Sequence, residues 1–204
     1  MGKAFLRNLI KQAEKKIDEH IAPEDIICFD IETTGLSHNH DEILQLSIIN
    51  GKGDVLLNEY IRPKHTTSWP STQKIHGISP EMVANKPTID EYIPQLNDIF
   101  GKAKIITGYN IKSFDRHFIM SAGITIPDSA KIFDVMIEFA PIYGEKCSTD
   151  SRRYKKQKLA VCAEYYGYKG NGKFHDSLED VRATLHCYWG VVRDKNALRQ
   201  YKPR

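Results

Sequence analysis

Residues 26–36 read Ile26-Ile27-Cys28-Phe29-Asp30-Ile31-Glu32-Thr33-Thr34-Gly35-Leu36, an apolar run that ends by presenting two carboxylates two positions apart. Because side chains alternate between the two faces of a strand, Asp30 and Glu32 are expected to leave the same face of a sheet. Two like charges held this close repel each other, and a hard divalent cation such as Mg²⁺ is their natural partner. A buried strand of any α/β domain can also end in an Asp beside a ligand crevice. The stretch therefore predicts a strand and a candidate metal site that the downstream sequence has to support.

Length and composition favour one domain with additions. The 204 residues, 41% of them hydrophobic, supply one sizeable core but not two comfortable ones. The formal net charge of +3 is mildly basic, which fits a nucleic-acid partner without indicating one. No apolar stretch is long enough to span a membrane, and the basic N-terminus lacks the apolar core of a signal peptide. We therefore expect no membrane partner.

The four cysteines are widely scattered and contain no Cys-x-x-Cys pair. We expect reduced and mostly buried thiols, which favours a cytoplasmic location. A zinc site built from His38, His40 and Cys147 is an alternative, but its spacing is not that of a known zinc template.

Apolar periodicity predicts an α/β order of elements. Strands are predicted over residues 25–31, 42–50, 54–62, 104–107 and 131–134. Helices are predicted over residues 88–100, 113–122, 157–166 and 176–193, with a further helix after the fifth strand that ends near Pro141. The segment with Pro70, His76 and Pro80 is predicted as a loop, and Thr88 with Glu91 as a capping box.

Two segments stand apart from this core. Residues 1–23 are predicted as an amphipathic helix ahead of a domain over residues 24–204; packing on that domain is favoured over contact with a partner or nucleic acid. Residues 144–158 are polar and basic and are predicted as a mobile loop. This loop can guide a phosphate backbone, and a plain solvated charge run is the alternative.

Three polar residues downstream of the opening stretch lie at the edges of apolar elements. Asp115 stands near a predicted helix start, where it can simply stabilise the helix dipole. His175 precedes the last helix and Asp180 lies one turn inside it, while Asp176 and Glu179 form a capping box. Each residue alone has an ordinary structural explanation, so their order along the chain carries the information.

The chain contains, in order, the motifs Phe29-Asp30-Ile31-Glu32-Thr33-Thr34-Gly35-Leu36, His76-Gly77-Ile78, Asn110…Phe114-Asp115…Phe118 and His175-x4-Asp180. Together they resemble the DEDDh (DnaQ-like) family of 3′→5′ exonucleases, which includes the proofreading ε subunit of bacterial DNA polymerase III and ribonuclease T. The resemblance spans residues 25–192. It departs from many members in one respect, because three residues instead of two separate Asn110 from Phe114.

The resemblance implies a ribonuclease-H-like fold, an α/β mixed five-stranded sheet with helices on both faces. It also implies a site for two divalent cations, Mg²⁺ or Mn²⁺, held by Asp30, Glu32, Asp115 and Asp180. His175 would be the general base that takes a proton from the attacking water, and the product would be a nucleoside 5′-monophosphate. Substrate contacts would come from Thr33, Thr34, Gly35, Leu36, His76, Asn110 and Phe118. For Phe118, plain core packing is an equal alternative.

Three functions remain open. A metal-dependent 3′→5′ exonuclease on single-stranded or frayed DNA is favoured. An RNA 3′-end trimming enzyme, ribonuclease-T-like or oligoribonuclease-like, is the second, because no motif reports how the 2′-hydroxyl is treated. A catalytically idle, polymerase-associated nucleic-acid-binding subunit is the third, and the full set of five residue types argues against it. The expected partner is a nucleic-acid 3′ end, with a DNA polymerase or repair protein as a further candidate.

Overall fold

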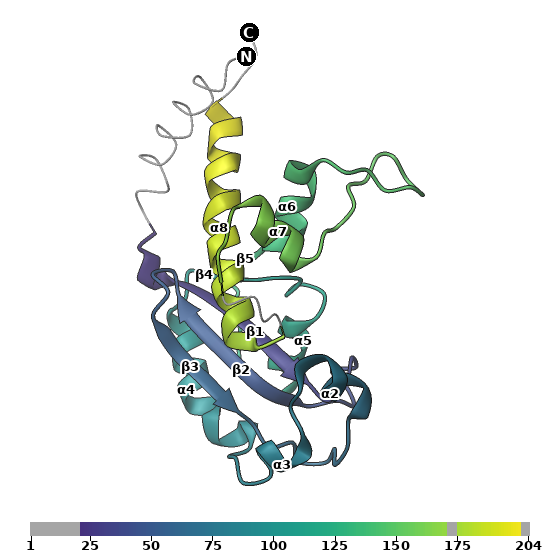
Figure 1. Ribbon diagram of the computed structural model, residues 1–204. Coiled ribbons are helices and arrows are strands. Elements are labelled where there is room, and N and C mark those ends of the chain that lie inside the picture. Colours follow the sequence, from purple (N-terminus) through teal and green to yellow (C-terminus); the bar gives the residue numbers. More distant parts are fainter. Residues whose placement is uncertain (1–20, 171–174, 201–204) are drawn as a thin grey trace.

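A mixed five-stranded sheet forms the centre of the protein, whose computed structural model describes residues 21–170 and 175–200 (Figure 1). Residues 1–20 of the helix predicted over residues 1–23 lie outside the described residues, and the boundary at residue 23 stays a prediction. The strands are β1 (Ile26–Thr33), β2 (Ile43–Asn50), β3 (Val55–Tyr60), β4 (Ile105–Gly108) and β5 (Lys131–Asp134), in the order β3-β2-β1-β4-β5. β2 runs antiparallel to β1 and β3, whereas β4 runs parallel to β1 and β5.

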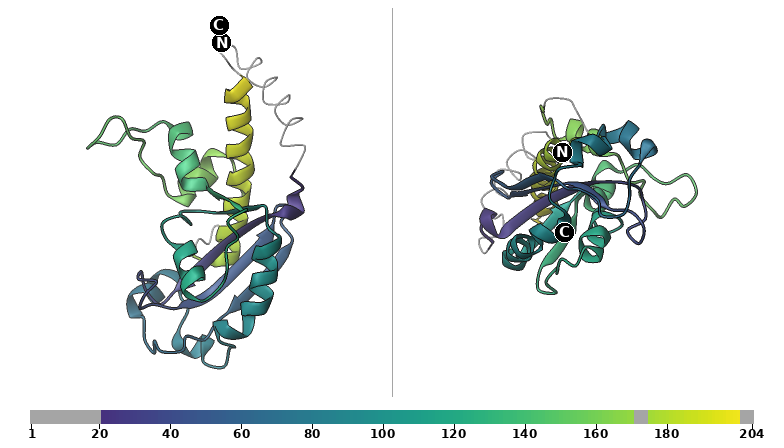
Figure 2. Two further views of the ribbon diagram at one scale, coloured as in Figure 1. Left: turned by 180° about the vertical axis from the view of Figure 1, so that it is seen from behind. Right: turned by 90° about the horizontal axis from the view of Figure 1, so that it is seen from below.

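Helices cover both faces of this sheet, as the ribonuclease-H-like fold requires (Figures 1 and 2). α4 (Ile89–Lys102) and α5 (Asp115–Ser121) contribute to the core on one face. α6 (Val135–Tyr143), α7 (Leu159–Tyr165) and α8 (Ser177–Gln200) contribute to the core on the other. The short helices η1 (Pro23–Asp25), α2 (Pro70–His76) and α3 (Pro80–Val83) lie outside these layers.

The alternation along β1 decides which face carries the candidate site. Ile27, Phe29 and Ile31 belong to the core cluster beneath α4 and α5, and the rings of Phe29 and Phe100 meet edge to face at 5.3 Å. Ile26 and Cys28 belong to the cluster beneath α8. Since Asp30 and Glu32 continue this second register, they leave the sheet on the α8 side.

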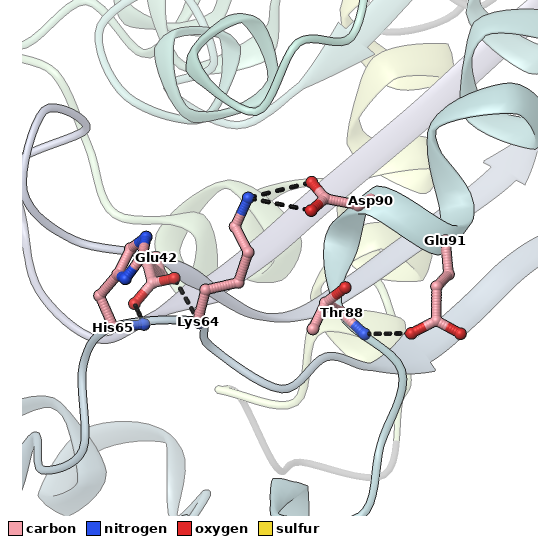
Figure 3. A network of polar contacts seen from close by, with 6 residues as sticks. All are labelled: Glu42, Lys64, His65, Thr88, Asp90 and Glu91. Atoms are coloured by element: carbon pink, nitrogen blue, oxygen red, sulfur yellow. Dashed lines mark hydrogen bonds and ion pairs between the residues drawn. The ribbon is translucent and has the colours of Figure 1, made fainter.

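Figure 3 shows the contacts that join the start of α4 to the chain after β3. The backbone N–H of Thr88 donates to Glu91 Oε1 at 2.9 Å, and the reciprocal contact is present, so the predicted capping box is confirmed. Lys64 Nζ lies 3.0 Å from a carboxylate oxygen of Asp90. The Glu42 carboxylate accepts hydrogen bonds from the backbone N–H groups of Lys64 and His65. These contacts fix the segment between β3 and α4, and they tie it to Glu42, which directly precedes β2.

Some predicted elements need correction. The segment predicted as a loop between Pro70 and Pro80 contains α2 and α3, and each begins with a proline whose fixed φ suits the first helical position. The last helix continues to Gln200 instead of 193 because Lys195 pairs with Glu138 of α6 and Ala197 is buried. The loop over residues 144–158 is partly ordered, since an isolated β-bridge pairs Lys146 with Tyr154.

All four cysteines are free thiols, and all except Cys147 are buried. None of the helices in the described part of the chain combines the length and apolar character needed to cross a membrane.

Candidate active site

The candidate site lies where the C-terminal end of β1 meets the N-terminal end of α8. Asp30 and Glu32 are half-buried on the α8 side of β1, and the pairing with β2 shifts register after Glu32. Cys28 Sγ, on the same face, donates to the carbonyl of Val181 in α8 at 3.6 Å. The strand and the helix are therefore in direct contact just below the two carboxylates.

The start of α8 brings the His175-x4-Asp180 motif to this position. Asp176 Oδ1 accepts from the N–H groups of Leu178 and Glu179, at 3.0 and 3.4 Å, so the predicted helix cap is present. The Ser177 and Ser47 hydroxyls are 2.5 Å apart, which ties the helix start to β2. This anchoring fixes where the residues on either side of the cap can reach.

His175 and Asp180 face Glu32 across this junction. His175 has a left-handed backbone with φ of 74°, and its N–H donates to Asp180 Oδ2 at 3.1 Å. Ligand atoms of Glu32, His175 and Asp180 all lie within 4.8 Å of one another, which makes them a group that could hold a metal ion. Three residues that are up to 148 positions apart in sequence thus converge at one point.

Asp115 approaches the same carboxylates from α5. It is the first residue of that helix and is only 3% exposed. Burial raises the pKa of Asp115 to about 7, against the effect of backbone N–H groups of Asp115 and Ile31 that lower it. Its charge is, after burial, the largest cause of the raised pKa of Asp30, so the two carboxylates are near neighbours.

The electrostatics of the cluster are those of crowded, desolvated anions. Burial, followed by the charges of Asp115, Glu32 and Asp180, raises the pKa of Asp30 well above its ordinary value. Burial, followed by the charges of Asp180, Asp115 and Asp176, raises the pKa of Glu32 to about 8, and burial raises the pKa of Asp180 to about 6. The cluster without a cation is therefore an unfavourable arrangement for ionised carboxylates.

An unsatisfied oxygen shows what the cluster can accept. Asp180 Oδ1 is buried and has no hydrogen-bond partner among the described residues. A buried carboxylate oxygen without a donor is costly unless another group compensates it. The neighbouring atoms that could act as metal ligands are carboxylate oxygens and one imidazole nitrogen. A hard divalent cation fits this set of ligands.

The loop that follows β1 is held by a separate polar network. Thr34 Oγ1 donates to Asp41 at 3.1 Å and accepts from the N–H of Glu42. The Thr72 hydroxyl of α2 donates to the Thr34 carbonyl at 3.1 Å. Thr33 and Thr34 are buried, so their side chains fix the loop from inside while the turn beyond them faces outward.

His76 supports the same loop in a defined tautomer. Its Nδ1 accepts from the N–H of Ile78 at 3.0 Å, so a neutral ring carries its proton on Nε2, which lies 3.2 Å from the Thr33 carbonyl. Burial lowers the pKa of His76 below its ordinary value, which favours this neutral form. His76 thus links α2 to the end of β1.

Gly35 and Leu36 form the outer part of the loop. A Cβ at Gly35 would lie 2.4 Å from the Asp41 carboxylate, so no larger residue fits without moving Asp41. Leu36 is 81% exposed, an unusual environment for a large apolar side chain next to a charged site. An exposed leucine here is available for contact with a ligand.

The residues around Asn110 are arranged differently from the others. Asn110 is half-buried with φ of 67°, and its N–H donates to Asp134 Oδ1 at 3.1 Å. Asp134 also accepts from the Lys112, Met136 and Ile137 N–H groups, which gives it a structural role. Phe118 is 3% exposed, packs on Phe114 in the core and is one of the residues that line a hollow of about 210 Å³.

Several supporting residues were not anticipated from the sequence. Asp41 and Thr72 hold the loop after β1, and the charge of Asp176 contributes to the raised pKa of both Asp30 and Glu32. No local pattern could have linked Thr72 to Thr34, because the contact joins segments 38 residues apart. The alternative zinc ligands His38, His40 and Cys147 do not converge; among the described residues, the only group of such ligand atoms that does is Glu32, His175 and Asp180.

Comparisons with known proteins agree with this geometry. The exonuclease family model RNase_T matches residues 27–188. The PolC-type DNA polymerase III of Listeria innocua serovar 6a is 36% identical over 184 residues, which is 87% of this chain but 12% of that protein. The chain spans 11–12% of the length of the PolC-type relatives that it matches.

Solved structures support the fold. Exonuclease X in complex with 5′ overhanging duplex DNA superposes with a TM-score of 0.60 at 20% identity, covering 83% of this chain and 92% of that one. Exonuclease I of E. coli in complex with a dT13 oligonucleotide superposes with a TM-score of 0.66 at 18% identity, covering 86% of this chain and 42% of that one. At these identities the likeness concerns the fold alone.

Proposed function

Because this chain belongs to the RNase_T exonuclease family, as its DnaQ-like motifs predicted, we propose that it is a metal-dependent 3′→5′ exonuclease that shortens single-stranded or frayed DNA. The products are nucleoside 5′-monophosphates released one at a time from the 3′ end. The residues assigned to the chemistry are Asp30, Glu32, Asp115, His175 and Asp180.

One observation carries the proposal. Four carboxylates and an imidazole from β1, α5 and the start of α8 converge, and one buried oxygen of Asp180 has no donor among the described residues. A structural role does not account for this arrangement, because buried like charges destabilise a fold unless a ligand compensates them.

The carboxylates are suited to hold two divalent cations, Mg²⁺ or Mn²⁺. Asp30, Glu32 and Asp180 would bind one, and Asp30 with Asp115 the other. When bound, such ions lower the pKa of the attacking water and offset the charge that develops on the leaving 3′ oxygen. The protein's part is to fix the oxygens that hold them and to exclude bulk water from the buried side of the cluster.

His175 is assigned the transfer of the proton. Its ring lies on the exposed side of the cluster, within 4.8 Å of ligand atoms of Glu32 and Asp180, where a water attacking the phosphorus could reach it. An imidazole suits this task because its unperturbed pKa lies near neutrality. The hydrogen bond from the His175 N–H to Asp180 keeps its backbone in place for that purpose.

The loop after β1 is assigned the binding of the terminal nucleotide. Gly35 allows the backbone to approach a sugar or phosphate closely, and the exposed Leu36 can pack against a base. Thr33, Thr34 and His76 keep this loop in shape through the contacts described above, and Asn110 and Phe118 would complete the pocket wall.

DNA is the proposed substrate because the solved relatives named above are bound to DNA and the sequence relatives are PolC-type DNA polymerases. Work alongside a DNA polymerase or in repair is part of the proposal, as is a reducing, cytoplasmic setting for the four free thiols.

The experiment compares wild type, Asp30→Asn and a matched control, Asp128→Asn, whose carboxylate is exposed on a loop. Each is incubated with 5′-labelled single-stranded DNA and the matched RNA, in Mg²⁺ and in EDTA. We expect a Mg²⁺-dependent ladder that shortens from the 3′ end for wild type and Asp128→Asn, and none for Asp30→Asn. Faster shortening of RNA would replace DNA with RNA as the proposed substrate. No shortening of either polymer would overturn the proposal that the protein is an exonuclease.

A further inference from the structure

Residues 144–158, here called the basic arm, connect α6 to α7 and project clear of the body (Figures 1 and 2). The N–H of Cys147 donates to the Arg153 carbonyl at 2.9 Å, and the N–H of Lys155 donates to the Glu145 carbonyl at 2.8 Å. The arm is therefore a short antiparallel ribbon, a shape that holds its side chains at defined spacings.

The base of the basic arm is fastened beside the candidate active site. Gln157 is buried, and its side chain donates to Glu145 Oε2 at 2.8 Å. The Tyr109 hydroxyl donates to the Gln157 carbonyl at 2.8 Å. Since Tyr109 follows β4 and precedes Asn110, the basic arm leaves the domain at the sheet edge that carries the candidate site.

The charge of the chain is concentrated in the basic arm. It has six Lys or Arg residues against two acidic ones, a surplus of four that exceeds the +3 of the whole chain. Both acidic residues are already paired, Glu145 with Lys155 and Asp150 with Arg152. Among the residues that the structure describes, no ion pair involves the exposed side chains of Lys146, Arg153, Lys156 and Lys158.

We propose that the basic arm binds the phosphate backbone of single-stranded DNA upstream of the 3′ end held in the active site, an inference that rests on the proposed function. Exposed cations that neutralise phosphates release condensed counterions, which supplies sequence-independent affinity. Tyr154 adds an aromatic ring, 39% exposed with Lys146 Nζ 3.5 Å from its centroid, on which a base can stack. The arm thereby extends a one-nucleotide active site into a longer track.

The binding test compares Arg153→Gln/Lys156→Gln with a matched control, Lys86→Gln/Lys131→Gln, which removes two exposed lysines away from the arm. The affinity for an oligothymidylate of about 20 nucleotides is measured in EDTA over a series of salt concentrations. The arm variant should bind about tenfold more weakly at low salt. The negative slope of log K against log salt should become shallower by about 1.4. The control should retain the wild-type slope.

A second readout separates this inference from the proposed function. In Mg²⁺, the ratio of kcat/KM on the long oligonucleotide to that on one of about four nucleotides should fall about tenfold in the arm variant only. If wild type releases no nucleotide but the salt slope still responds, the proposed function fails and the arm remains a DNA-binding element. If the two double variants have equal salt slopes and equal kcat/KM ratios, the proposal that the basic arm binds DNA is overturned. An acidic protein would then be the next candidate partner of the arm.

Loss of folding can be recognised. All four substituted side chains are exposed, so thermal unfolding followed by circular dichroism should give the same Tm for both double variants and wild type. Should the arm variant unfold early, Lys156→Gln alone supplies the test, with an expected slope change of about 0.7.

Discussion

Asp134 at the end of β5 and Asp180 at the start of α8 are both buried carboxylates, but they differ in how many hydrogen bonds they accept. Asp134 is completely buried and accepts four backbone N–H groups, at 3.0–3.3 Å. Asp180 accepts one, from His175, and its other oxygen has no partner among the described residues. A satisfied buried charge indicates a structural role, whereas an unsatisfied one beside other carboxylates indicates a place kept for a ligand.

The two regions should therefore fail in different ways when altered. In the region of Asp134, a substitution should damage folding, because the backbone donors lose their acceptor. In the carboxylate cluster, a substitution should damage activity while relieving repulsion. This trade between stability and function is the general expectation for active sites.

The largest expected effect is on activity in Asp30→Asn. Loss of a carboxylate that both cations would share should lower kcat/KM on single-stranded DNA by about 10³-fold or more. In EDTA the same variant should melt at a Tm no lower than that of wild type, because one of several crowded, desolvated carboxyl groups has gone. Calorimetry and a nucleotide-release assay on the same preparation check both parts. A large drop in Tm would place Asp30 with Asp134 as a structural residue.

Asp134→Ala should produce the converse result. Four backbone N–H groups lose their acceptor at once, and the N-terminal cap of α6 is removed. We expect a loss of about 3 kcal/mol in the free energy of unfolding, given the usual penalties for a lost cap and for unsatisfied buried donors. Urea titration measures it. Asp128→Ala, on an exposed loop, is the control and should change the free energy by less than about 0.5 kcal/mol.

The contrast between these two aspartates was partly visible in the sequence. Asp30 stands in a motif whose spacing alone predicts its face of the sheet, whereas the sequence around Asp134 shows only that it ends a short predicted strand. The capping box of Thr88 and Glu91 was predictable for the same reason, since it depends on four neighbouring residues.

What could not be predicted depends on contacts between distant segments. α2 and α3 could not be predicted because they are short and each begins with a proline, and their positions are decided by the burial of Trp69 and Val83 against Leu44. The extension of α8 depends on Glu138 of another helix. The orphaned oxygen of Asp180 exists only because the folded chain buries it without a donor, which no periodicity reports.

Metal binding sharpens the comparison at an intermediate magnitude. A ligand that binds only the folded protein stabilises it by about 2.7 kcal/mol at a concentration 100 times its Kd. Mg²⁺ or Mn²⁺ should therefore raise the Tm of wild type, and chelation should reverse the rise. Asp134→Ala should keep this gain from its lower starting point, whereas Asp30→Asn should lose most of it. Differential scanning fluorimetry across a Mn²⁺ series tests this, and an equal gain in all three proteins would mean that the ion binds elsewhere.

The smallest effect is expected at Asp176, which shares features of both regions. Like Asp134, it accepts backbone N–H groups at a helix start, from Leu178 and Glu179. Like Asp180, it adds negative charge that raises the pKa of Asp30 and Glu32. The side chain of Asp176 is nevertheless exposed, so water screens its charge. Capping of the helix is therefore its main contribution to stability.

Asp176→Asn preserves a good helix cap and removes the charge, whereas Asp176→Ala removes both. The asparagine variant should stay within about 0.5 kcal/mol of wild type in unfolding free energy, and the alanine variant should lose about 1 kcal/mol. Because Asp176 is not among the assigned ligands, the nuclease activity of Asp176→Asn should remain within about threefold of wild type. Urea titration and kcat/KM measured on the same preparations decide between the two roles. If Asp176→Asn loses activity as completely as Asp30→Asn while its stability is unchanged, Asp176 is a ligand, and hydrogen-bonding to backbone N–H groups would no longer distinguish structural from functional carboxylates in this protein.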